Sequence, residues 1–169
     1  MITIPALVGI VVFGTAMVWA AVSDAATRTI PNCISILMLA GYCLLAPLAG
    51  FSLRDMGASA GAAGLVGIVL VVFFARGWIG GGDAKLITAT TLWLGPDQLL
   101  NFLLWTSVVG GLLAVAALAF RGVPMNTAGA MPVWVSRTLG RSGGIPFALA
   151  IAPAGLARLY FSSWMIPVH

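Results

Sequence analysis

The chain has 169 residues, of which 61% are hydrophobic and only 7% are charged. Soluble globular domains are about 25% charged. This composition excludes a disordered chain, a nucleic-acid-binding domain and a disulfide-rich secreted scaffold, and it argues against a water-soluble enzyme. It predicts an all-α fold, a polytopic membrane helix bundle that forms a single domain over residues 1–169. The net charge is +4, and the four acidic residues are all aspartates.

Six apolar stretches remain when the sequence is cut at its charges and at its Gly/Pro clusters. A transmembrane helix needs about 20 apolar residues, and we expect these stretches to be the spans. They run from Ile2 to Val22, Cys33 to Gly50, Gly57 to Ala75, Leu86 to Leu94, Gln98 to Phe120 and Ile145 to Trp164. The fourth covers only about half a bilayer, so it is expected to be tilted, partly submerged, or extended backward through the preceding glycines. No basic region precedes the first span, which is therefore expected to be retained rather than cleaved as a signal peptide.

Basic residues are unevenly divided between alternate connections. Six follow spans one, three and five, and they are Arg28, Arg76, Lys85, Arg121, Arg137 and Arg141. Two lie on the other side, and they are Arg54 and Arg158. Because basic residues concentrate on the cytoplasmic side, the first set is predicted to be cytoplasmic and both termini outside. Aromatic residues near the span ends are expected to form interfacial belts, with Trp19, Trp78 and Trp134 on one face and Trp93, Tyr160 and Trp164 on the other.

Cysteine and histidine provide no metal site. Cys33 and Cys43 are separated by about 15 Å along one predicted helix, so they cannot form a disulfide with each other. We expect both to be small core residues. The only histidine is His169. The sequence therefore predicts neither a metal site nor a cofactor.

Small residues recur along the third span. They provide small-x-x-x-small spacings, which favour close helix packing over a functional groove. The residues are Gly57, Ala60, Gly61, Ala63, Gly64 and Gly67.

Two aspartates follow spans on the predicted cytoplasmic side. Asp24 closes the first span, and Asp83 follows a run of glycines after the third. Two carboxyl groups within a few ångströms share a proton, so one can activate water while the other protonates a peptide carbonyl, as in an aspartic protease. Gly80 and Gly82 would allow a substrate backbone to approach closely.

Each aspartate also has a structural interpretation. Asp83 could cap the helix that it precedes, and Asp24 could be an interfacial charge. On the opposite face, Asp97 is expected to be the N-cap of span five, and Asp55 a solvated loop charge. The position of Asp24 and Asp83 on one face, in a chain with so few acids, favours catalysis over capping.

The motifs around these two aspartates resemble those of the type IV prepilin peptidases, which are GxGD-type intramembrane aspartic proteases. One motif is an aspartate, a short basic stretch and Ile-Pro-Asn, matched by Asp24, Arg28, Ile30, Pro31 and Asn32. The other is Gly-x-Gly-Asp-x-Lys, matched by Gly80, Gly82, Asp83 and Lys85. Phe147 and Ala148 depart from the family's Pro-Tyr-Gly segment, so we assign no site role there.

The resemblance implies that Asp24 and Asp83 are the catalytic dyad and that Gly80 and Gly82 shape the site. Lys85 could orient Asp83, keep it ionised, or anchor span four at the interface. Pro31 and Asn32 are expected to start the second helix rather than to contact substrate.

The resemblance also implies partners and location. The substrates would be prepilins or pseudopilins with a short basic leader, cut at the cytoplasmic edge of the bacterial inner membrane. The partners would be this substrate and the lipid bilayer, with no nucleic acid. The chain begins at a span, without the paired-cysteine region of longer, N-methylating members, and this favours the peptidase-only form associated with Flp or tight-adherence pili.

Two other functions stay open. A small proton-coupled transporter could use the aspartates as a relay, and it would place acids deep within interrupted spans. A non-catalytic assembly factor of an envelope complex would need neither carboxyl group.

Overall fold

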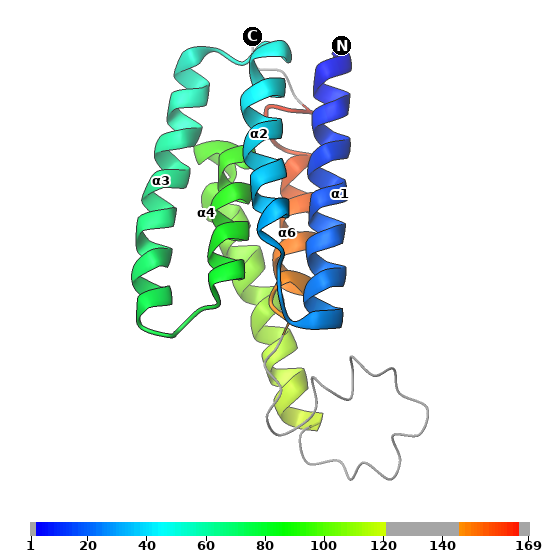
Figure 1. Cartoon of the computed structure of the whole chain (residues 1–169), viewed down its shortest axis with the longest axis vertical. Coiled ribbons are helices and arrows are strands. Elements are labelled where there is room, and N and C mark those ends of the chain that lie inside the picture. The colour runs from blue at the N-terminus through cyan, green and yellow to red at the C-terminus, as the bar shows by residue number, and fades with distance from the viewer. Residues whose placement is uncertain (1–2, 121–145, 166–169) are drawn as a thin grey trace.

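A computed structural model describes residues 3–120 and 146–165, and within these ranges the chain is helical and contains no strand. The helices are α1 (Ile4–Thr27), α2 (Asn32–Leu48), α3 (Leu53–Ala75), α4 (Gly81–Phe120) and α6 (Ala148–Leu159). They run alternately up and down the bundle (Figure 1). The connection that carries Arg121, Arg137 and Arg141, and the positions of Trp134 and His169, lie outside the described residues.

The all-α prediction is confirmed, and the helices have the composition of a membrane protein. By length and composition, α1, α3 and residues 81–119 could each cross a membrane, while α2 and α6 are shorter apolar helices. Large apolar side chains cover the outside of the bundle, and Ile4, Leu53 and Ile68 are more than two-thirds exposed. Cys33 and Cys43 are free and belong to this outer surface, so the expectation that they are core residues was wrong. The number of six spans stays a prediction.

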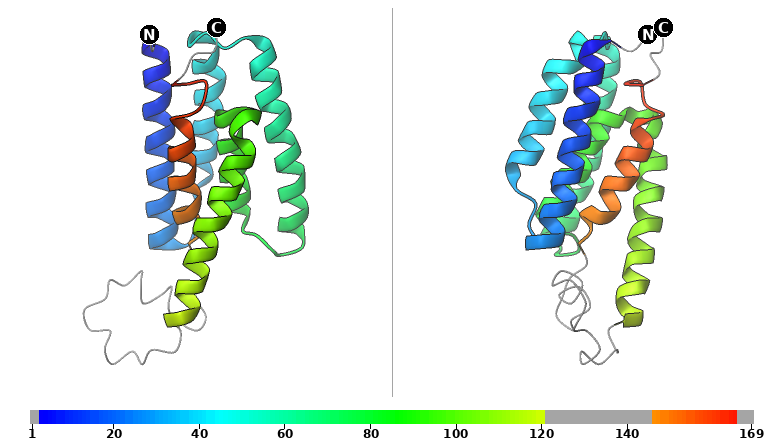
Figure 2. Two further views of the ribbon diagram at one scale, coloured as in Figure 1. Left: turned by 180° about the vertical axis from the view of Figure 1, so that it is seen from behind. Right: turned by 90° about the vertical axis from the view of Figure 1, so that its right-hand side faces the viewer.

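Helix α4 contains a sharp reversal at Gly95. Gly95 has φ 73° and ψ 177°, and Pro96 follows it. The chain rises from Gly81 to Leu94 and then returns along the bundle, so that the second half extends past the end at which α4 begins (Figures 1 and 2). The first half is about 21 Å long and starts at Gly81, which confirms the extension of the fourth stretch backward through the glycines.

Two aspartates at the opposite end of the bundle differ from their predicted roles. Asp55 is the third residue of α3 and forms a capping box with Ser52, so it is part of a helix cap rather than a loop charge. Its backbone N–H donates to Ser52 Oγ over 3.2 Å, while its carboxylate accepts from the Ser52 N–H over 3.2 Å. Asp97 lies inside the helix that resumes after Gly95, and is not its N-cap.

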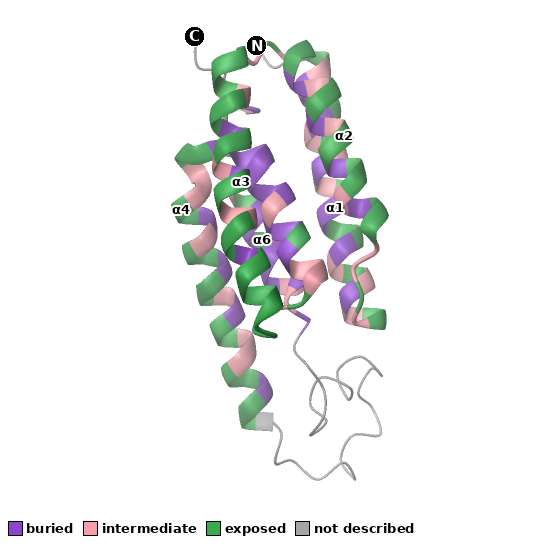
Figure 3. Cartoon of the chain, turned by 60° about the vertical axis from the view of Figure 1, so that its left-hand side comes forward, coloured by how far each residue is buried: buried purple, intermediate pink, exposed green. Residues whose placement is uncertain are grey.

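The centre of the bundle is α6, which packs against both α1 and α4. Figure 3 shows α6 as a buried helix within more exposed neighbours. Gly155 makes this position possible, because a Cβ there would lie 3.2 Å from Thr90 on α4 and 3.4 Å from Phe13 on α1. A larger residue would force the three helices apart, because protein interiors are close-packed.

An aromatic cluster replaces one of the predicted interfacial belts. Trp93 and Trp164 are 1% and 2% exposed, and their rings stack with centroids 4.7 Å apart. The Trp93 indole N–H donates to the Met38 carbonyl oxygen over 2.9 Å, and the Trp164 N–H donates to the Trp93 carbonyl oxygen over 3.0 Å. These indoles are therefore core residues whose polar groups are satisfied internally. Trp19, Trp78 and Tyr160 are exposed, and their place in an interfacial belt stays a prediction.

The small residues of α3 are packed less closely than expected. A Cβ added at Gly57, Gly61 or Gly64 would meet nothing within 4 Å. Gly67 does contact α4, because a Cβ there would lie 3.3 Å from Thr88. Close packing is therefore confined to part of the stretch, and Gly64 instead borders an open groove.

We predict that Gly95→Ala lowers the stability of the bundle by about 1–3 kcal/mol, because the backbone conformation of Gly95 is one that only glycine adopts readily. The added Cβ would also lie 3.2 Å from Ser59 Oγ. Thermal unfolding in detergent measures the effect. Gly61→Ala is the control, since it adds a methyl group in open space and improves helix propensity. Equal stability of the two variants would contradict the prediction.

Candidate active site

The two aspartates singled out by the sequence meet at one end of the bundle. Asp24 is in the last turn of α1 and is 7% exposed, while Asp83 is in the first turn of α4 and is half-buried. The carboxyl groups are close enough for the charge of Asp24 to act on Asp83. The fold therefore brings together two carboxyl groups that are 59 positions apart in the sequence (83 − 24).

The N-terminus of α6 holds the buried carboxylate of Asp24. The backbone N–H of Ala148, the first residue of α6, donates to Asp24 Oδ2 over 3.0 Å. The N–H groups of a first helical turn have no partner within the helix, and the helix dipole adds a partial positive charge there. This terminus therefore orients Asp24 and offsets part of the cost of burying its charge.

Sequence comparison by motif missed this contact. Phe147 and Ala148 differ from the family's residues at this point, and we assigned them no role. The donor is a backbone group, so it does not depend on which side chain follows Phe147. Pro146, which lies just before the start of the apolar helix, is the sequence feature that could have indicated a helix N-terminus with a free N–H donor here.

The turn after Asp24 is held by local hydrogen bonds. Arg28 ends α1 in the left-handed conformation with φ 58°, and its N–H donates to the Asp24 carbonyl oxygen over 2.9 Å. The Ser23 hydroxyl donates to the Thr29 carbonyl oxygen over 2.9 Å, and the Thr27 hydroxyl donates to the Ser23 carbonyl oxygen over 2.8 Å. The Arg28 N–H thus satisfies a carbonyl group that the helix end leaves free, and the two side-chain bonds tie the last turn of α1 to the loop that follows.

Gly80 and Gly82 each have a steric reason to lack a side chain. A Cβ at Gly80 would lie 3.0 Å from Asp83 Oδ2, so the Asp83 carboxyl group occupies the space that a side chain would fill. A Cβ at Gly82 would lie 3.0 Å from the Cβ of Ile30, in the loop between α1 and α2. Gly80 thus leaves room for the carboxyl group, and Gly82 allows the loop after Asp24 to pack against the start of α4.

Lys85 contacts the first motif rather than Asp83. Its ammonium group donates to Asn32 Oδ1 over 2.9 Å. Two residues along a helix correspond to a rotation of about 200°, so Lys85 and Asp83 point in different directions. Asn32 is the first residue of α2, as expected, and this hydrogen bond ties the start of α2 to the start of α4.

Asp83 is not a conventional helix cap. Helix α4 begins at Gly81, and the Ala84 N–H donates to the carbonyl oxygen of Gly80, which places Asp83 inside the first turn. A half-buried carboxyl group there, beside a second carboxyl group, forms a site suited to acid–base chemistry. The fold and site define a class: an apolar helix bundle with paired carboxyl groups at one end.

Comparison with known proteins identifies the family within this class. Residues 10–115 match the model of the type IV leader peptidase family, and this range contains Asp24, Asp83 and Lys85. A relative from Bacillus subtilis (strain 168), described as a prepilin leader peptidase/N-methyltransferase, is 30% identical over 157 residues, covering 90% of this chain and 56% of the relative. The chain belongs to the type IV leader peptidase family.

The chain spans about half the length of this curated relative. No solved structure matches the chain.

We predict that Gly82→Ala lowers stability by about 1–3 kcal/mol, the usual cost of overpacking. The new methyl group would press on the Cβ of Ile30, which cannot move without its backbone. Gly81→Ala is the matched control, because its methyl group would meet only the ring of Phe74, which is 54% exposed and can turn away. Thermal unfolding in detergent compares the two, and an equal loss in both variants would contradict the role of Gly82.

Proposed function

We propose that this chain is a membrane-embedded aspartic endopeptidase that removes the short basic leader of prepilins or pseudopilins. The observation that carries the proposal is the meeting of Asp24 and Asp83, from two separate motifs, at one end of an apolar bundle. Membership of the type IV leader peptidase family supports it, as does the similarity to the Bacillus subtilis protein described as a prepilin leader peptidase/N-methyltransferase.

The hydrogen bond to the Asp24 carboxylate is the basis for assigning a role to each carboxyl group. Asp24 accepts the Ala148 N–H at a helix terminus, an arrangement that favours a carboxylate. We assign Asp24 as the base that takes a proton from water as the water oxygen attacks the peptide carbonyl carbon. Asp83, as the carboxylic acid, donates its proton to the carbonyl oxygen. Asp24 then gives its proton to the leaving amine as the C–N bond breaks, and the diol returns a proton to Asp83.

The distribution of basic residues supports a cytoplasmic location for the site. Arg28, Arg76 and Lys85 lie at the end of the bundle that carries both aspartates, whereas Arg54 and Arg158 lie at the other end. Basic residues concentrate on the cytoplasmic side of membrane proteins. We therefore propose that cleavage occurs at the cytoplasmic edge of the bacterial inner membrane, ahead of the apolar helix of the substrate.

The positions of the aspartates favour a peptidase over the two alternatives. Both lie in terminal turns at one end of the bundle, whereas a transporter relay requires acids near the bilayer midplane. An assembly factor would not need Asp24 and Asp83 to meet. The name of the relative also includes N-methyltransferase. That this chain lacks methyltransferase activity stays a prediction, which mass spectrometry of the mature pilin N-terminus would test.

We expect Asp24→Asn and Asp83→Asn each to reduce cleavage of a co-expressed prepilin by about 10²–10⁴-fold, the usual contribution of acid–base catalysis. Loss of the leader is followed by electrophoresis, with the membrane level of each variant checked. Asp97→Asn is the control, because this exposed aspartate lies at the opposite end of the bundle. Full processing by either dyad variant would overturn the assignment. Inhibition by a chelator that zinc reverses would argue for a different mechanism.

We expect Gly80→Ala to slow cleavage by up to about 100-fold with little loss of stability, because a displacement of about 1 Å at a reacting group can cost that much. The added methyl group would displace the Asp83 carboxyl group, which is 3.0 Å from its position. Cleavage rate and unfolding temperature are measured together, with Gly81→Ala as the control. A Gly80→Ala variant that cleaves at the wild-type rate would show that Asp83 does not act from this position.

A further inference from the structure

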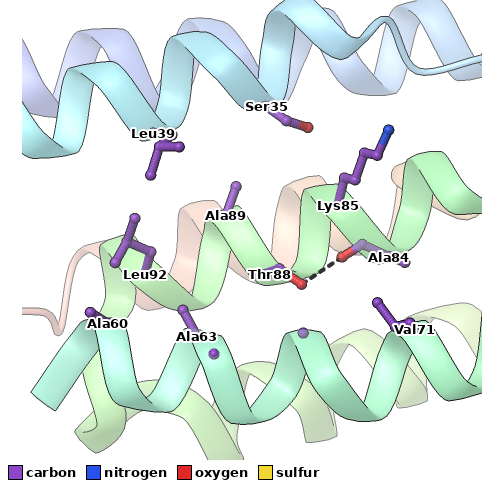
Figure 4. Close-up of a pocket in the computed structure, with 12 residues that line it drawn as sticks. Ser35, Leu39, Ala60, Ala63, Val71, Ala84, Lys85, Thr88, Ala89 and Leu92 are labelled. Carbon is purple, nitrogen blue, oxygen red and sulfur yellow. Dashed lines mark hydrogen bonds between the residues drawn. The ribbon is translucent and has the colours of Figure 1, made fainter.

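An open groove of about 480 Å³ lies between α2, α3 and α4. We call it the lateral groove. Its walls include Leu39 on α2, Ala60, Gly64 and Gly67 on α3, and Ala84 and Thr88 on α4 (Figure 4). The volume falls within the range of about 300–1,000 Å³ that is typical of ligand pockets. The groove therefore has room for several apolar side chains.

The α3 wall suits a helix rather than a compact ligand. Its lining extends from Ala60 to Val71, which corresponds to about 16 Å, or three helical turns. Gly64 is exposed, and a Cβ there would meet nothing within 4 Å. Small residues on one helix allow the backbone of a second helix to approach closely within a membrane. Apart from the contact of Gly67 with Thr88, this wall is left open along a length that a short helical segment would fill.

The lateral groove reaches the end of the bundle that carries the candidate active site. Ala84 and Lys85, which line the groove, directly follow Asp83 on α4. In Figure 4, Lys85 lies toward one end of the groove, and Leu39 and Leu92 lie toward the other. The end of the groove marked by Lys85 is therefore the end nearer to the dyad.

Charge sets the direction in which such a polypeptide would lie. Lys85 is the charged residue among the lining side chains, and the remainder of the lining is almost entirely apolar. Its positive charge would repel a basic leader, whereas the apolar walls would accept an apolar helix. The leader would therefore extend away from the bundle, and the segment after the cleaved bond would enter the groove.

We propose that the lateral groove binds the first turns of the apolar helix of the prepilin, immediately after the cleaved bond. This inference rests on the proposed function and adds a docking site for the substrate. The cleaved bond would be extended at Asp24 and Asp83, because a helical peptide hides its carbonyl groups in hydrogen bonds. The helix would begin beside Lys85 and run along Gly64, and its binding would position that bond.

A matched pair of glycines tests the docking site. Gly64→Leu fills the groove, whereas Gly61→Leu adds the same side chain to the same helix at an exposed glycine that does not line the groove. A Cβ added at either position would meet nothing within 4 Å. We expect Gly64→Leu to lower kcat/KM for a full-length prepilin by about tenfold or more, which corresponds to about 1.4 kcal/mol of lost transition-state binding. Gly61→Leu should cleave at the wild-type rate.

A short substrate separates docking from chemistry. A peptide that contains the leader and the cleaved bond but lacks the apolar helix should be cut equally by wild type and Gly64→Leu. An equal loss on both substrates would mean that Gly64→Leu damages the dyad, and it would overturn the proposal. If Gly64→Leu does not reach the membrane, Ala60→Leu replaces it, because Ala60 is also exposed and lines the groove.

Photo-crosslinking identifies the occupant directly. A benzophenone amino acid is placed at position 64 or 61 of the Asp24→Asn, Asp83→Asn double variant, which should retain the prepilin uncut. We expect a crosslink to the apolar helix of the prepilin from position 64 and a much weaker one from position 61. Crosslinks from position 64 to lipid alone, or to a second copy of this chain, would overturn the proposal.

The outcomes for the groove and for the proposed function are distinguishable. If the aspartate variants lose cleavage and Gly64→Leu cleaves full-length prepilin normally, the peptidase assignment stands and the docking site is wrong. If the wild-type protein cleaves no prepilin, both fail.

Discussion

The hydrogen bond from the Ala148 N–H to Asp24 Oδ2 is the contact on which the site depends. Asp24 is almost fully buried at the end of an apolar helix, and a buried carboxylate is unfavourable unless donors or charges compensate it. The N-terminus of α6 provides the donor and a partial positive charge. This requirement places the start of α6 beside the end of α1, and α6 then occupies the centre of the bundle.

Glycines decide how closely the other parts can approach this contact. Gly155 allows α6 to lie against both α1 and α4, and Gly82 allows the loop after Asp24 to pack on the first turn of α4. Gly80 leaves space for the Asp83 carboxyl group. The hydrogen bond between Lys85 and Asn32 then ties the two motifs together. Neighbouring segments thus pack closely against α6 and against the start of α4. The α3 wall is open by contrast, and Gly64 faces the lateral groove there.

Several features of the fold followed from the sequence because they depend on local properties. Apolar length predicted the helices, and the low charge made Asp24 and Asp83 conspicuous. The break near Gly95 was visible as a Gly-Pro pair. Helix bounds were less accurate, because the first span was expected to end at Val22 and α1 continues to Thr27. Trp93 and Trp164 were misplaced, since a tryptophan near a span end suits an interface and a core equally well until its neighbours are known.

The sequence by itself determined the membrane character of the chain, the helical class and the two aspartates of the candidate site. Each of these follows from composition, or from residues within a few positions of one another. The tertiary structure alone decided that Ala148 supports Asp24, that Lys85 contacts Asn32 instead of Asp83, and that the small residues of α3 border a groove. These contacts join segments far apart in the chain, and the first uses a backbone donor that no residue type reveals.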